Sequence, residues 1–247
     1  MRRRVDAYVV FCSTYKDVLP VLRTQYARAV STVGAYDPAS KRHVQPEQQL
    51  GEHLIAYYWQ GNLSRDDPLL VEFFRLAPDA LRAHVIGHVG HSLVDTSQPL
   101  AQQFSERLRD FWAWRLRTAQ ASGNVMGYRA ELAQLGWWFG SRKLDDASAL
   151  AQVRAVLVLT GHIEPDFQVG ETLEAIAPSH LSDAVVCAAR MIEGSRHDWT
   201  LYGIRDHITA ILKVALGSAN VEAKATAERL VQYLVGRGHF EYRILLG

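Results

Sequence analysis

Apolar residues recur with the helical period in one segment after another along this chain. Leu150, Val153 and Val156 share one face of a segment that stops at Gly161, and an acidic pair, Asp66-Asp67, stands before Pro68 at the start of another. Proline and acid in a first turn and glycine after a last turn are the usual helix boundaries. No segment shows the strict alternation of a half-buried strand. The sequence therefore predicts an all-α protein.

The predicted helices are joined by short connections that carry Gly, Ser, Asn and Pro. Residues 36–46 are polar and contain proline, so we expect a loop there. The expected helices are 15–33, 50–59, 66–76, 77–94, 99–123, 128–139, 146–161, 163–177, 180–193, 200–216 and 219–236.

From about residue 66 the helix pairs recur at roughly 35–45 residues, the period of HEAT and armadillo solenoids. Each pair has an apolar face that it buries only by stacking on its neighbours. We expect a HEAT-like superhelix of about 10–12 antiparallel helices, forming a single repeat domain over residues 1–247. Residues 1–62 would be an N-terminal helical cap and residues 63–247 the stacked pairs. A compact irregular bundle is the alternative.

The composition is that of a packed globular protein without a strong electrostatic field. Hydrophobic residues make up 48% and charged residues 21%, and 27 Lys and Arg face 26 Asp and Glu. With so small a net charge, the chain has no overall electrostatic attraction to nucleic acid or to an anionic membrane. Cys12 and Cys187 are far apart, and no apolar run has the roughly 20 residues of a membrane span. Asp6 interrupts the only stretch that is similar to an export signal. We expect a cytoplasmic protein.

One predicted helix places four possible metal ligands on one face. His84, His88, His91 and Asp95 are spaced at i, i+4, i+7 and i+11. Imidazoles and a carboxylate on adjacent turns suit a transition metal. The glutamate of a zinc-hydrolase helix is absent, however, and Leu81, Val85 and Leu93 lie on the opposite face. A solvated polar face is therefore the favoured interpretation, and a metal site is an alternative.

The segment 107–117 interleaves aromatic and basic residues, as surfaces that bind single-stranded nucleic acid do. Its apolar residues share one stripe and are most simply core, which leaves Arg107, Arg109 and Arg117 as solvated charges. The alternative hypothesis is a helical repeat that grips a nucleic-acid backbone through Arg107, Arg109, Arg115 and Arg117.

Three aromatic residues stand side by side at Trp137, Trp138 and Phe139. Neighbours are about 100° apart on a helix, so all three cannot face the same core. Large aromatic side chains are common anchors at protein interfaces. This cluster is the first candidate for contact with a partner protein or a second copy, and burial between repeats is the alternative.

The sequence contains none of the common catalytic or cofactor motifs. It has no Gly-x-Gly-x-x-Gly, no phosphate loop, no Gly-x-Ser-x-Gly and no Cys-x-x-Cys. The leading hypothesis is a non-enzymatic scaffold or sensor module without a cofactor, which binds a protein partner or itself.

The C-terminal third also supports this hypothesis through a resemblance. From Gly136-Trp137-Trp138-Phe139 and Leu144-Asp145-Asp146 to residues 231–243, it resembles the helical C-terminal domain of large bacterial multidomain proteins. That uncharacterised family is often joined to an N-terminal sirtuin-like effector of antiviral defence. The resemblance implies a sensing or scaffolding part whose enzymatic domain lies elsewhere in a longer protein, and it implies no functional residues.

Overall fold

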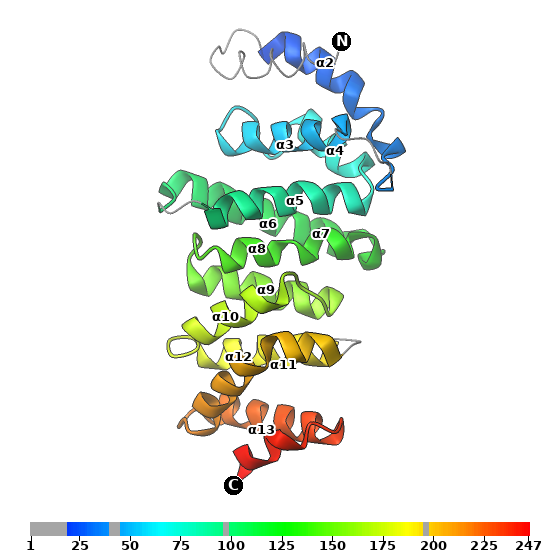
Figure 1. Ribbon diagram of the computed structural model, residues 1–247. Coiled ribbons are helices and arrows are strands. Elements are labelled where there is room, and N and C mark those ends of the chain that lie inside the picture. The colour runs from blue at the N-terminus through cyan, green and yellow to red at the C-terminus, as the bar shows by residue number, and fades with distance from the viewer. Residues whose placement is uncertain (1–18, 40–44, 96–98, 195–197) are drawn as a thin grey trace. The chain divides into compact units, whose positions relative to one another are not determined.

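The computed structural model describes residues 19–39, 45–95, 99–194 and 198–247 (Figure 1). Within these ranges the chain forms twelve α-helices and three 3-10 helices and contains no β-strand. The prediction of an all-α fold with about 10–12 helices is therefore confirmed. No helix in the described ranges is long and apolar enough to cross a membrane.

The helices follow one another with short connections. The 3-10 helices are η2 (Val33–Ala35), η3 (Val125–Tyr128) and η4 (Phe240–Leu246). The α-helices are α2 (Leu19–Val30), α3 (Pro46–Trp59), α4 (Pro68–Leu76), α5 (Asp79–Asp95), α6 (Gln102–Ala121), α7 (Arg129–Ala133), α8 (Leu135–Gly140), α9 (Asp146–Thr160), α10 (Asp166–Ile176), α11 (Leu181–Gly194), α12 (Asp198–Leu216) and α13 (Val221–Gly236).

Several predicted boundaries are confirmed by side-chain caps. Asp67, Asp145 and Asn220 each accept a hydrogen bond from a backbone N–H in the first turn of α4, α9 and α13. Gly161 has a φ of 62° just after α9, a conformation that glycine adopts without strain. The expected start of the first helix before residue 19, and Cys12, lie outside the described residues.

The helix predicted over 128–139 is interrupted at Gln134, where α7 ends and α8 begins. The carbonyl of Ala133 accepts a hydrogen bond from Glu164 N at 2.9 Å. The amide of Trp137, which would otherwise bond that carbonyl, donates to Gln134 O at 3.2 Å. The helix predicted over 163–177 starts later than expected, at Asp166. Residues 163–165 are not helical, because their backbone docks on the break between α7 and α8.

The chain divides into two compact units, residues 1–82 and residues 83–247. The predicted single domain and its boundary between residues 62 and 63 stay predictions.

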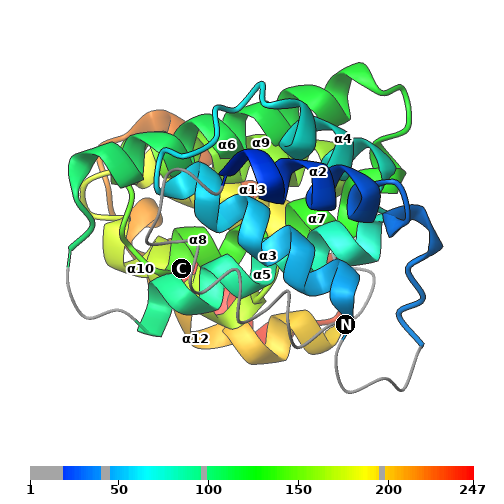
Figure 2. The same cartoon turned by 90° about the horizontal axis from the view of Figure 1, so that it is seen from above.

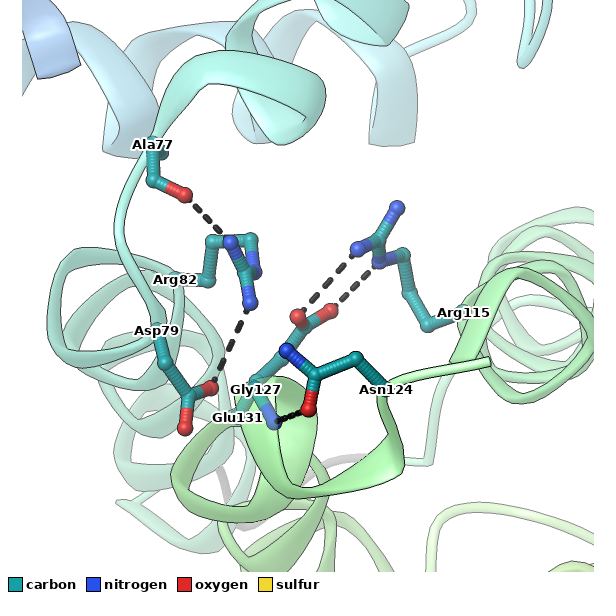
Figure 3. A network of polar contacts seen from close by, with 7 residues as sticks. All are labelled: Ala77, Asp79, Arg82, Arg115, Asn124, Gly127 and Glu131. Carbon is teal, nitrogen blue, oxygen red and sulfur yellow. Dashed lines mark hydrogen bonds and ion pairs between the residues drawn. The ribbon is translucent and has the colours of Figure 1, made fainter. Parts of the chain in front are cut away.

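In the first unit α2, α3 and α4 pack against one another around Tyr26, Leu54 and Phe73. Arg23 pairs with the α4 cap residue Asp67 at 2.7 Å. At the end of this unit Arg82 donates to Ala77 O and lies 3.5 Å from Asp79 (Figure 3).

The second unit is a stack of helices in two layers. The helices α9, α11 and α13 contact one another in turn, as do α8, α10 and α12. The part of α5 in this unit packs on α8, and α6 packs on α9. Figure 2, which looks along the stack, shows α6 and α9 on one side and α8, α10 and α12 on the other. We call α5, α8, α10 and α12 the first layer and α6, α9, α11 and α13 the second layer.

The core of the second unit lies between these layers. Trp138 of α8 is fully buried, with its ring centroid 5.9 Å from that of Phe111 and 6.3 Å from that of Trp112. Its Nε1–H donates to Ile86 O at 2.9 Å. The aromatic ring thus contacts α6, while its polar atom bonds α5, as a buried tryptophan requires.

Two glycines allow the first layer to pack this closely. A β-carbon at Gly90 would overlap the Cβ of Trp137, and one at Gly136 would overlap the carbonyl oxygen of Glu164. These positions therefore bring α5, α8 and the 161–165 loop together at backbone distance.

Substitution of glycine by alanine should have opposite effects at two helical positions. Gly90→Ala should destabilise the protein by about 1–3 kcal/mol, because the new methyl group meets Trp137. Gly203→Ala, in the exposed interior of α12 where an added β-carbon meets no atom, should stabilise it by about 0.5–1 kcal/mol. Urea unfolding measures both, and equal effects at the two sites would contradict the packing described.

Candidate histidine and aromatic surface

Histidine, aromatic and carboxylate side chains form a series of contacting pairs across the first layer. We call it the histidine band. Contacts between rings or polar atoms connect most of its members from one helix to the next. Its members are His84, His88 and His91 of α5, Trp137 of α8, His162 and Glu164 of the loop after α9, Phe167, Glu171 and Glu174 of α10, and His207 of α12.

The band begins where α5 meets α8. The rings of His84 and His88 are stacked at 6.4 Å, as residues four apart on a helix can be. The ring of His91 lies 4.0 Å from that of Trp137. Trp137 is half-buried and His91 is exposed, so this pair presents aromatic surface to solvent.

The band continues from α8 to the loop before α10. Gln134, at the break between α7 and α8, donates from Nε2 to Glu164 Oε2 at 2.7 Å. The other oxygen of Glu164 lies 2.7 Å from His162 Nε2. The hydrogen bond from His162, more than any other contact, lowers the pKa of the Glu164 carboxyl below its usual range.

The band ends where α10 meets α12. Phe167 is 53% exposed, and its ring meets that of His207 edge to face at 5.0 Å. The Nδ1–H of His207 donates to Glu174 Oε2 at 2.6 Å. Because Phe167, Glu171 and Glu174 are spaced at i, i+4 and i+7, they share one face of α10. An aromatic ring and two carboxylates therefore stand together at the surface.

The four proposed metal ligands on α5 share a face but do not converge. At 1.5 Å per residue, His84 and Asp95 are about 16 Å apart along the helix axis. The ring of His91 contacts that of Trp137, at an interplanar angle of 45°. The described residues contain no group of three histidine, cysteine or acidic side chains placed to hold a metal ion. The four residues therefore do not form one ligand cluster in the structure, and three of them, His84, His88 and His91, belong to the histidine band.

The four arginines of the nucleic-acid hypothesis do not all lie on the protein surface. Arg109 and Arg117 are exposed and Arg107 is half-buried, but Arg115 is 1% exposed. Arg115 forms two hydrogen bonds with the buried carboxylate of Glu131 on α7 (Figure 3), one of them at 3.2 Å. Its guanidinium also lies 4.8 Å from the Trp114 ring and 5.7 Å from the Tyr128 ring. The prediction that Arg115 contacts a phosphate backbone is therefore corrected.

The three adjacent aromatic residues have different environments. Trp138 and Phe139 are buried, at 0% and 2% exposure. Only Trp137 reaches the surface. The predicted contact cluster is therefore corrected to this one residue, which the structure joins to the histidine band.

Sequence reasoning missed the part of the band around Phe167 and His207. The spacing of Phe167, Glu171 and Glu174 was a visible signal for one helix face. His207 follows Glu174 by 33 positions, and no local pattern connects the two. Only the packing of α12 on α10 brings them together.

A comparison with known proteins identified no relative of this chain. No family model, curated protein or solved structure matches the chain. The resemblance to helical domains of sirtuin-like multidomain proteins stays a prediction.

The buried pair of Arg115 and Glu131 should be sensitive to the loss of either partner. Arg115→Met should destabilise the protein by about 3–5 kcal/mol, because the buried carboxylate of Glu131 loses the guanidinium group that pairs with it. The double variant Arg115→Met, Glu131→Leu should recover much of that loss. Urea unfolding of Arg115→Met, Glu131→Leu and the double variant measures this coupling, and a double-variant effect equal to the sum of the two single effects would contradict it.

The pKa of Glu164 should depend on His162. A lowered folded-state pKa stabilises the protein above the unfolded carboxyl pKa, and that contribution is lost as the pH falls through the folded-state value. His162→Ala should raise the pKa of Glu164 toward its usual range in a carboxyl NMR titration. Gln134→Ala, which removes a weaker contribution, should raise it less. An unchanged pKa in His162→Ala would refute the pairing.

Proposed function

We propose that this chain is a non-enzymatic interaction module of HEAT-like stacked helices that binds a protein partner through the histidine band. The proposal takes the helix pairs as repeat units and the first layer as their binding face. The leading hypothesis from the sequence is kept, and its contact surface is enlarged from Trp137 to the whole band.

The observation that carries the proposal is that an aromatic ring reaches the surface on each of two neighbouring helices, α8 and α10. Trp137 and Phe167 would each be expected in a core, yet one is half-buried and the other is 53% exposed. Each is held by a histidine from another helix, at 4.0 and 5.0 Å between ring centroids. Aromatic side chains fixed in this way lose little entropy on binding and are typical anchors of protein interfaces.

The cysteine content supports a cytoplasmic location within the same proposal. Cys187 is buried in α11, and burial raises the pKa of its thiol to about 12. A thiol of that kind is inert and serves as a small apolar core residue. It supports neither a redox role nor a nucleophilic one.

Two surface substitutions test the proposal in a pull-down from the native cells, with quantified partners. Trp137→Ala and Phe167→Glu should each reduce the capture of the same partners by about tenfold, since interface anchors contribute 1–2 kcal/mol or more. Phe240→Ala is the matched control, because Phe240 is 69% exposed on η4 and lies outside the band.

Light scattering of the purified chain separates a partner protein from a second copy of the chain. Circular dichroism should show that all three variants are folded. An unchanged partner set and unchanged mass in both band variants would reject the band as the binding surface.

A further inference from the structure

Charge is distributed unequally between the two layers of the second unit. Residues 83–95, 135–140 and 161–176, which form most of the first layer, contain no lysine and no arginine. They contain the carboxylates of Asp95, Glu164, Asp166, Glu171 and Glu174. The remaining helix of the first layer, α12, contains Asp198, Arg205, Asp206 and Lys213. The helices of the second layer carry both signs in nearly equal number. Their bases are Arg107, Arg109, Arg115, Arg117, Arg154, Arg190, Lys224 and Arg229, and their acids are Glu106, Asp110, Asp146, Asp183, Glu193, Glu222 and Glu228.

Little positive charge from neighbouring elements neutralises the band. Arg129 of α7 is near enough to contribute to the lowered pKa of Glu164. On α12, Arg205 lies 3.4 Å from Glu241 of η4, which is not part of the band. Arg142, just after α8, lies 3.0 Å from Asp146. The formal charge of the band is negative while its histidines are neutral, although the whole chain has a net charge of +1.

The carboxylates of the band stand beside exposed aromatic rings. Glu171 is exposed, is one turn from Phe167, and makes no hydrogen bond or ion pair in the described part of the chain. Glu164 and Glu174 keep side-chain exposures of 49% and 43% although each is bonded to a histidine. A guanidinium or ammonium group can pair with a carboxylate and lie over an aromatic face at the same time.

We propose that the partner of the histidine band is a basic peptide segment, whose arginine or lysine side chains pair with Glu164, Glu171 and Glu174 and lie over Phe167 and Trp137. This inference rests on the proposed function and names the chemistry of its partner. An acidic segment would be repelled by the same carboxylates, and a purely apolar segment would leave Glu171 without a counter-charge.

The test uses the full chain and two fluorescein-labelled peptides of equal length, one alternating arginine with alanine and the other alternating glutamate with alanine. Fluorescence anisotropy should show that only the arginine peptide binds, and that binding weakens as salt is added. Glu171→Lys should weaken binding about fivefold, since it replaces an exposed ion pair by a repulsion. Phe167→Ala should weaken it about threefold through the loss of a cation–π contact.

The matched control is Glu193→Lys. Glu193 is an exposed acid on α11 in the second layer, so this variant has the same net charge as Glu171→Lys. It should bind the arginine peptide as the unmodified chain does.

Two results would overturn the inference: equal binding of both peptides, or equal weakening by Glu171→Lys and Glu193→Lys. If the arginine peptide fails to bind while Trp137→Ala and Phe167→Glu still lose their cellular partners, the basic partner is wrong and the interaction module stands.

Discussion

The packing of Trp138 holds the second unit together. Its ring lies against Phe111 and Trp112 of the second layer, and its Nε1–H bonds to Ile86 O of the first layer. The helix that carries it, α8, has only six residues. A helix this short gains little stability from its own hydrogen bonds and depends on tertiary contacts. By fixing α8, Trp138 also fixes its neighbour Trp137, which points about 100° away toward His91 and the surface.

A backbone hydrogen bond holds the next part of the band against the break before α8. Because the Ala133 carbonyl bonds to Glu164 N, the 161–165 loop is drawn onto α8, where Gly136 leaves room for it. Glu164 then meets both Gln134 and His162. The carboxylate of Glu164 is therefore held beside the break in the helix between α7 and α8.

The helices could be predicted from the sequence because their signals are local. The caps Asp67, Asp145 and Asn220 and the glycine after α9 each act on their own helix. The break at Gln134 could not be predicted, because its cause is the amide of a residue in another element. Arg115 is an intermediate case. Arg115 lies seven residues after Leu108 and three after Trp112, so the helical period already places it on the same face as these apolar residues. Its partner Glu131 can be identified only from the folded structure. The α5 part of the band was likewise visible as a face, whereas its continuation over α10 and α12 depends on long-range packing.

The central claim is that the first layer is the binding face and the second layer is not. Photo-crosslinking from single sites tests it most directly, with benzoylphenylalanine replacing Phe167 on α10 or Gln232 on α13, both of them exposed. After irradiation in the native cells, the account predicts a discrete crosslinked product from position 167 and none from position 232. Products of equal yield from both positions, or a product from position 232 alone, would contradict it.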